Sequence, residues 1–175
     1  ETTARVASAV NFHHYEKGWH PSATLGVFGA TAACCRLLGL GQAAVTNALA
    51  LAVSLASGIK VNFGTMTKSL HIGHCARNGA MAALLAREGF TASPHAFEHE
   101  QGFLNVFNGP GTFDAERITT DWWAPPQILD PGVVIKQHPC CASAHGPIDA
   151  TLMLMKRYGL GSGDIAAIET RCHPR

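Results

Sequence analysis

Residues 64–74 carry the side chains best suited to chemistry, and they read Gly-Thr-Met-Thr-Lys-Ser-Leu-His-Ile-Gly-His. Lys68, His71 and Cys75 are spaced i, i+3 and i+7, so a helix would present them on one face. Only 14% of the residues are Asp, Glu, Lys or Arg. A lysine set among small and aliphatic residues therefore indicates a negatively charged ligand. The competing interpretation is an ordinary solvated lysine.

A second group of candidates lies in residues 136–145, Lys-Gln-His-Pro-Cys-Cys-Ala-Ser-Ala-His. We expect a strand before this segment and a helix after it, and strand-to-helix loops often carry functional residues. Lys136 and His145 are the best candidates here. Cys141 as a nucleophile is a weaker hypothesis, because the sequence identifies no base beside it.

His20 stands in the tetrapeptide Gly-Trp-His-Pro at the start of an expected buried helix. Unpaired backbone N–H groups at a helix start favour an anion there. The alternative is that His20 only caps the helix, and the sequence leaves both interpretations open.

No metal or cofactor is expected. His71, His74 and Cys75 could form half of a metal site, but structural zinc needs four convergent ligands and this helix offers no further one. No phosphate-binding glycine loop, Gly-x-Ser-x-Gly or His-Glu-x-x-His pattern occurs. The carboxylates of the polar segments are expected to be solvated: Glu98, Glu100, Asp114, Glu116, Asp121 and Asp130.

Composition limits the classes of function. With 175 residues, 47% of them hydrophobic, the chain can form a domain with a real core. A formal net charge of +1 provides no electrostatic footprint for nucleic acid or an acidic membrane. We find no signal peptide and no uninterrupted apolar run long enough to span a membrane. The six cysteines lack C-x-x-C spacing, so most are expected to be buried in the core as free thiols. Free thiols are typical of a reducing compartment, so we expect a cytoplasmic protein.

Periodicity, first-turn prolines and terminal glycines predict a mainly α fold. Helices are expected at residues 4–16, 21–38, 42–56, 67–88, 96–107 and 144–158, and strands at 133–135 and 165–170. We therefore predict part of a helical, bundle-like domain over residues 1–120, then a linker and the start of a smaller α+β domain over residues 121–175. The chain opens on Glu1 and closes just after an expected strand, which suggests a segment of a longer protein.

The helices at residues 21–38 and 42–56 are apolar on nearly every side, which predicts burial all round. Their small residues favour a tightly packed helical layer or a helix at a subunit interface. Gly73 and Gly79 each cost a helix about 1 kcal/mol relative to alanine. They make sense where another helix or a ligand comes close.

Three ordered segments resemble the MmgE/PrpD family, which includes 2-methylcitrate dehydratase, cis-aconitate decarboxylase and iminodisuccinate epimerase. The segments are residues 18–26 with 28–30, residues 64–73, and residues 136–141 with His145 and residues 148–149. The resemblance implies a homodimeric, metal-independent enzyme with a large helical domain, a smaller α+β lid and an active site between them. This chain would be a central piece of it.

The resemblance also implies roles for individual residues. His20, Lys68 and Lys136 match family active-site positions, where the lysines would hold substrate carboxylates and the histidine would line the pocket. One family member has a histidine where this chain has Cys141, and whether His145 compensates stays open. The expected catalytic residues are His20, Lys68, Lys136 and His145, and the expected substrate-binding residues are Lys68, His71, Lys136 and Cys141.

The chemistry shared by the family is proton removal next to a carboxylate, followed by loss of water, loss of CO2 or reprotonation. Fixed cations stabilise the charge that accumulates, and a neutral histidine or perturbed lysine moves the proton. The leading hypothesis is therefore a lyase or isomerase acting on a di- or tricarboxylate, similar to 2-methylcitrate dehydratase. The alternative is a non-catalytic helical dimerisation module. The isolated 175-residue chain is expected to be inactive.

Overall fold

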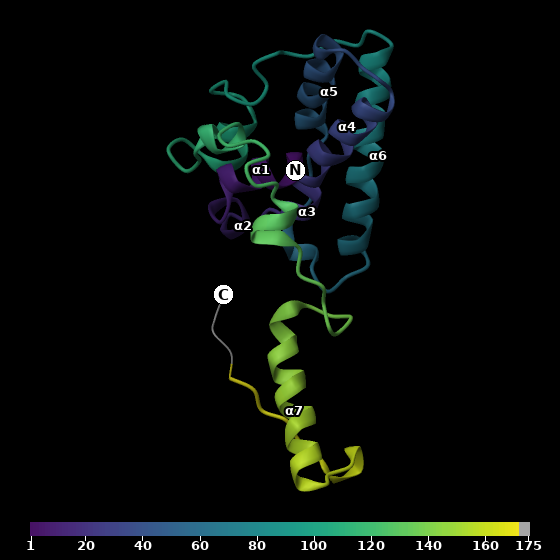
Figure 1. The fold of residues 1–175 in the computed structure, drawn as a ribbon, viewed down its shortest axis with the longest axis vertical. Coiled ribbons are helices and arrows are strands. Elements are labelled where there is room, and N and C mark those ends of the chain that lie inside the picture. The colour runs from purple at the N-terminus through teal and green to yellow at the C-terminus, as the bar shows by residue number, and fades with distance from the viewer. Residues whose placement is uncertain (172–175) are drawn as a thin grey trace. The chain divides into compact units, whose positions relative to one another are not determined.

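A computed structural model describes residues 1–171, which form two compact units, residues 1–132 and the residues from Val133 onward (Figure 1). Each unit is considered by itself. The first is helical and carries α1 to α6. Their bounds are α1 Thr2–Val10, α2 His13–Glu16, α3 Pro21–Thr24, α4 Gly26–Leu37, α5 Gln42–Leu55 and α6 Thr67–Arg87.

The expected helices at residues 42–56 and 67–88 are confirmed by α5 and α6. The other two expected helices of this region are each divided. α1 and α2 replace the helix at 4–16, and α3 and α4 replace the helix at 21–38, with Leu25 between them. The longer helix therefore begins at Gly26 rather than at Pro21. The expected burial on all sides is not found in this unit, since only Val27, Phe28, Thr31 and Cys35 of α4 are buried.

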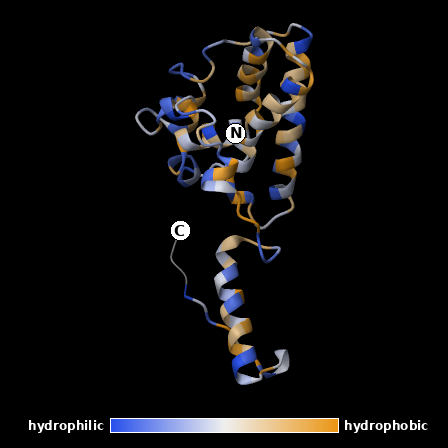
Figure 2. Cartoon of the chain, in the orientation of Figure 1, coloured by the Kyte–Doolittle hydropathy of each residue, from blue (hydrophilic) through white to orange (hydrophobic). Residues whose placement is uncertain are grey.

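α4, α5 and α6 pack against one another as the expected helical layer (Figure 1). Figure 2 shows α5 as hydrophobic over most of its length. Gly79 lies at the closest approach, since a Cβ there would be 2.5 Å from the Ala30 Cβ and 2.8 Å from the Thr31 backbone nitrogen. The expectation of a close neighbour is confirmed for Gly79. A Cβ at Gly73 would meet nothing within 4 Å in this unit.

Aromatic side chains fill the other part of this core. Phe28 and Phe103 are fully buried with ring centroids 4.9 Å apart, and Phe97 and Phe107 pack beside them. The helix expected at residues 96–107 is wrong. Turns lead instead into a π-helical turn, Leu104–Asn108, in a segment that Gly102 allows to fold tightly against the backbone of residues 96 and 99.

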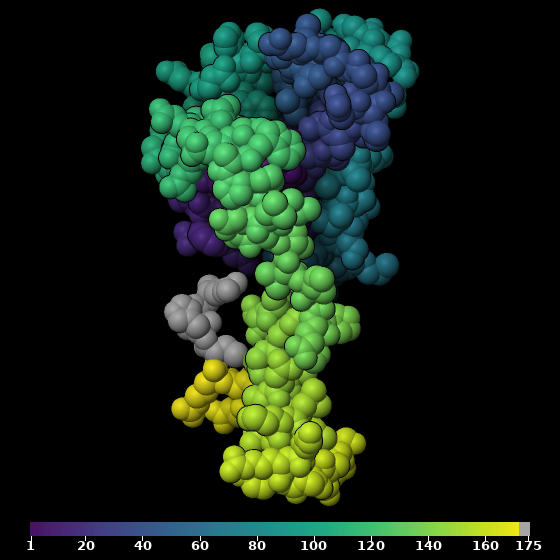
Figure 3. All heavy atoms as spheres, viewed as in Figure 1, coloured from purple at the N-terminus to yellow at the C-terminus, as the bar shows by residue number. Residues whose placement is uncertain are grey.

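Residues 115–132 belong to the helical unit, and Arg5 of α1 binds two of them. The Arg5 guanidinium donates hydrogen bonds to the backbone oxygens of Thr120 and Asp121 and pairs with Glu1. In Figure 3 these residues, in green, cover part of the purple N-terminal segment. Short 3-10 turns occur at Lys60–Asn62, Ala115–Ile118, Ala142–Ala144 and Ser162–Asp164. Residues Ile128–Gly132 form an irregular turn, in which Asp130 has extended backbone angles (φ −141°, ψ 117°).

The second unit contains α7, His145–Tyr158, which confirms the helix expected at residues 144–158 and ends at Gly159 in a left-handed conformation. Neither expected strand forms within residues 133–171, so the prediction of an α+β unit is not supported there. A strand requires a neighbour for its hydrogen bonds. Val134 and Ile135, which made the first segment strand-like, are 87% and 90% exposed.

The cysteines only partly follow the expectation of burial. Cys35 and Cys75 are buried, Cys34 and Cys140 are half-buried, and Cys141 is exposed. Cys172 lies outside the described residues.

Within residues 1–171, no helix is both long and apolar enough to cross a membrane. The six carboxylates predicted to be solvated are all exposed.

Candidate functional site

A short stretch of paired backbone places His20 beside the start of α6. Trp19 and Ile59 form an antiparallel bridge. The His20 N–H donates to the Gly58 oxygen at 3.0 Å, and the Lys60 N–H donates to the Gly18 oxygen at 2.8 Å. The connector between α5 and α6 is thereby fixed against the segment that precedes α3.

Gly58 makes this approach possible. Its φ of +124° is one that side-chain-bearing residues rarely adopt, and an added Cβ would lie 2.9 Å from the Ala23 Cβ. The same Cβ would lie 3.4 Å from two atoms of the His71 ring. Glycine is therefore required where the connector passes between α3 and His71.

His20, Phe63, Lys68 and His71 form one cluster, which we call the histidine–lysine cluster. The Nδ1 atoms of His20 and His71 are 3.1 Å apart. The Phe63 ring meets the His20 ring edge-on, with centroids 4.8 Å apart, and the Lys68 ammonium lies 4.6 Å from the centre of the Phe63 ring. The structure thus brings together the three cationic or titratable residues predicted for this unit, although they come from segments about 50 residues apart.

The electrostatics of the cluster favour a neutral His20. The side chain is only 5% exposed. Burial lowers the pKa of His20, and the nearby His71 and Lys68 lower this pKa further. No acidic side chain pairs with Lys68 within residues 1–171, so no protein carboxylate there neutralises its charge. An unprotonated imidazole beside an uncompensated ammonium can accept a proton from an anionic ligand.

Both interpretations of His20 at a helix start need correction. The residue is the N-cap of α3, but its side chain makes no capping hydrogen bond and pairs with His71 instead. α3 has only four residues, so its partial charge at the N-terminus is too small to define an anion site.

A buried histidine that was not predicted, His14, is linked to the His20 backbone through Thr24. His14 is fully buried, with its Nδ1 3.1 Å from the Asn108 Oδ1 and its Nε2 2.7 Å from the Thr24 Oγ1. The Thr24 hydroxyl also lies 3.2 Å from the His20 backbone oxygen. Burial lowers the pKa of His14 to about 4. Its position on an apolar helical stripe resembles that of an ordinary core residue, so the sequence carried no signal for this network.

The other predicted residues lie in the second unit. The Lys136 ammonium donates to the Cys140 oxygen at 3.0 Å. His145 begins α7, and its buried Nε2 has no hydrogen-bond partner within residues 1–171. His138, to which the sequence analysis gave no role, lies 2.8 Å from the Asp149 carboxylate and packs edge-on against the His145 ring, with centroids 5.1 Å apart. The sequence did carry a signal for the pairing of His138 with Asp149, because this acidic residue lies one turn into the helix that follows.

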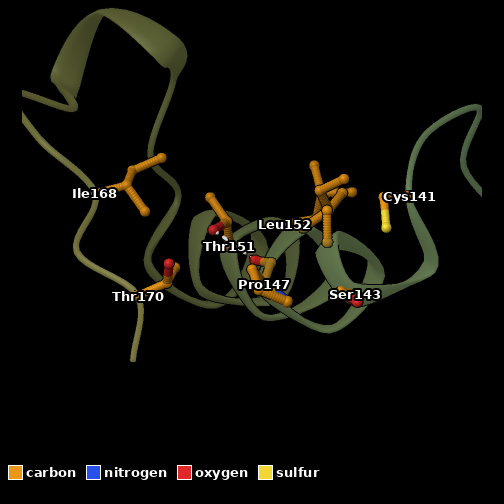
Figure 4. Close-up of a pocket in the computed structure, with 9 residues that line it drawn as sticks. Cys141, Ser143, Pro147, Thr151, Leu152, Ile168 and Thr170 are labelled. Atoms are coloured by element: carbon orange, nitrogen blue, oxygen red, sulfur yellow. Dashed lines mark hydrogen bonds between the residues drawn. The ribbon is translucent and has the colours of Figure 1, made fainter. Parts of the chain in front are cut away.

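Cys141 lines a separate cavity of about 540 Å³ in the second unit (Figure 4). Figure 4 shows Ile168 and Thr170 facing Pro147, Thr151 and Leu152 of α7 across it. The lining contains no lysine, arginine or histidine. This cavity therefore suits an apolar group rather than a carboxylate. Within residues 1–171, no three His, Cys, Asp or Glu side chains converge in a way that could hold a metal ion.

Comparison with known proteins decides the family. Residues 1–116 match the MmgE/PrpD N-terminal domain. The chain belongs to the MmgE/PrpD family. This membership confirms the resemblance inferred from the three motifs.

Relatives of this MmgE/PrpD chain include cis-aconitate decarboxylases, which are lyases. It is 32% identical to a cis-aconitate decarboxylase-like protein of Aspergillus oryzae, over 90% of this chain and 34% of the relative. It is 33% identical to the cis-aconitate decarboxylases of Homo sapiens and Aspergillus terreus. Those alignments cover 80% and 81% of this chain, and 28% and 30% of the relatives. The chain spans about a third of the length of these relatives.

Proposed function

We propose that the protein is a lyase or isomerase that removes a proton next to a carboxylate of a di- or tricarboxylate. The observation that carries this proposal is the histidine–lysine cluster. A neutral His20, held 3.1 Å from a second imidazole, lies beside a lysine that has no carboxylate partner within residues 1–171. This arrangement combines a proton acceptor with a fixed positive charge.

The chemistry requires both components. A substrate carboxylate already carries negative charge, and more accumulates as the adjacent proton leaves. A fixed ammonium, Lys68, stabilises this charge where it develops, and a neutral imidazole, His20, receives the proton. The similarity to cis-aconitate decarboxylases favours decarboxylation of cis-aconitate over dehydration of 2-methylcitrate.

We also propose roles for residues of the second unit, each argued within that unit. Lys136 binds a carboxylate, and His145, whose Nε2 lacks a partner within residues 1–171, transfers a proton. Cys141 contacts an apolar part of the substrate, which is supported by the apolar lining of its cavity. Lys136→Met is expected to raise KM for the substrate by about tenfold or more, since a charge-assisted hydrogen bond is removed.

A substrate panel tests the proposed function. The whole protein is incubated with cis-aconitate, 2-methylcitrate and a monocarboxylate control, without added metal and then with a chelator. We expect turnover of a di- or tricarboxylate that the chelator does not abolish. CO2 release from cis-aconitate identifies decarboxylation, and loss of water from 2-methylcitrate identifies dehydration. Absence of turnover on the whole panel favours the non-catalytic dimerisation module.

We further propose that the whole protein is a cytoplasmic homodimer. The family resemblance motivates the dimer, and large apolar side chains on the exposed surface of the helical unit support it: Leu37, Val61, Met66 and Leu70 are each more than 60% exposed. The buried thiols of Cys35 and Cys75 fit a reducing compartment.

A further inference from the structure

His20 and His71 form a hydrogen-bonded pair whose geometry limits their protonation. With the two Nδ1 atoms 3.1 Å apart, one nitrogen must donate and the other must accept. Two imidazolium rings cannot face each other in this way, so the pair holds at most one extra proton. The Nδ1 of His20 is therefore occupied, and its Nε2 is the nitrogen left for a reactant.

The two rings differ in their access to water. His20 is 5% exposed, whereas His71 is half-buried on the first turns of α6. The charged groups facing the pair are Lys68 of α6 and each ring for the other, and Phe63 of the connector packs against His20. A charge formed on His20 would be both poorly solvated and close to Lys68. The same charge on His71 lies nearer to solvent.

We propose that His71 is the proton-relay partner of His20 in the reaction. The inference deepens the proposed function and rests on it. At the start His20 carries its proton on Nδ1 and donates it to the Nδ1 of His71, which carries its own proton on Nε2. As the substrate C–H bond breaks, its electron pair stays on the substrate and its proton passes to the His20 Nε2.

The proton on the His20 Nδ1 then passes to the His71 Nδ1. His20 ends neutral with its proton on Nε2, and His71 ends as the imidazolium, so protons and charge balance. In a decarboxylation the relay runs in reverse: loss of CO2 leaves an electron pair on the substrate, the proton on the His20 Nε2 passes to that carbon, and the His71 imidazolium returns its Nδ1 proton to the His20 Nδ1. The buried ring therefore never has to keep the positive charge, which burial and Lys68 both disfavour.

His71→Gln separates a relay from simple positioning, because an amide can hydrogen-bond the His20 ring but cannot carry a proton onward. His74→Gln is the matched control: His74 is the next histidine of α6, and its ring lies by Asn78 rather than by His20. In the whole protein we expect His71→Gln to lower kcat by about 10- to 100-fold with KM within about threefold. The solvent deuterium isotope effect on the proton-transfer step should fall towards one, whereas His74→Gln should keep the wild-type values.

A second measurement does not depend on the variant folding or on the substrate. In wild-type protein with 15N-labelled histidine, a coupling between the two Nδ1 nuclei across the hydrogen bond is expected. A missing coupling, or a His71→Gln variant with wild-type kcat and isotope effect, overturns the relay. If the substrate panel shows no turnover while the coupling is present, the proposed function fails and the pair is only a structural contact.

Discussion

At the scale of single residues, the two buried histidines of the helical unit have different partners and different consequences. His14 is bonded at both nitrogens to neutral groups, Asn108 and Thr24, so it is held in place and has no nitrogen left for a ligand. His20 has one nitrogen bonded to another imidazole. We therefore assign His14 to stability and His20 to chemistry.

His14 predicts how stability depends on pH. Its pKa is about 4 in the fold and 6.5 in an unstructured chain, so the unfolded state binds more protons between these values. The contribution of His14 is complete above pH 6.5 and is lost as the pH falls towards 4, at up to about 1.4 kcal/mol per pH unit. Urea unfolding of the whole protein at a series of pH values measures this effect. Between pH 4 and 6.5, the free energy of unfolding should rise less steeply with pH in His14→Gln than in wild type. Equal slopes would show that His14 does not titrate in this way.

His20 predicts how activity depends on pH. Because burial, His71 and Lys68 lower its pKa, His20 stays unprotonated below the usual range of histidine. The acidic limb of kcat/KM should therefore lie below about pH 6.5. Lys68→Met removes one cation that faces His20, so this limb should move to higher pH in that variant. A limb that stays in place would indicate that another group controls it.

At the scale of elements, the contact between α4 and α6 depends on the absence of a side chain at Gly79. Gly79→Ala places a methyl group against Ala30 and the backbone of Thr31, and overpacking of this kind costs about 1–3 kcal/mol. Gly73→Ala is the matched control on the same helix, and it should stabilise the helical unit by up to about 1 kcal/mol because nothing in the unit opposes the methyl group. Thermal unfolding measures both effects: the melting temperature should fall in Gly79→Ala and should not fall in Gly73→Ala. Similar melting temperatures for the two would contradict the packing described.

The same elements show how far sequence reasoning reaches. α5, α6 and α7 were predictable because apolar runs, first-turn residues and terminal glycines agree along each of them. The break at Leu25 was not predictable, because no proline or other strong helix breaker occupies this position, and the contacts of the Thr24 hydroxyl with His20 and His14 beside it appear only in the fold. The strand at residues 133–135 was predicted from β-branched composition. Neither it nor the strand expected at 165–170 forms, since within residues 133–171 the partners that a strand requires are absent.

The candidate site was predictable only in part. Lys68 and His71 share a motif and one turn of helix, so their proximity follows from spacing. Their meeting with His20 depends on the backbone pairing of residues 18–20 with residues 58–60 and on the φ of Gly58, which the sequence does not reveal. Phe63 carried no signal beyond being an aromatic residue between two glycines.

At the scale of the whole molecule, the chain corresponds to about a third of the length of its decarboxylase relatives. Assays therefore belong on the whole protein. We predict that it sediments as a dimer at micromolar concentration, because exposed residues such as Leu37 and Met66 are 86% and 93% accessible in the isolated chain. A whole protein that sediments as a stable monomer with full activity would contradict the proposed homodimer.

One comparison in the whole protein decides whether Lys68 takes part in the reaction: the turnover of the preferred di- or tricarboxylate by Lys68→Met against that by Lys60→Met. The two lysines are matched, because each ammonium lies over an aromatic ring, Phe63 for Lys68 and Tyr15 for Lys60. Only Lys68 belongs to the histidine–lysine cluster. We predict that Lys68→Met lowers kcat/KM by about 100-fold or more while Lys60→Met stays within about threefold of wild type. Near-normal turnover by a folded Lys68→Met variant would show that the Lys68 ammonium does not stabilise the reacting substrate.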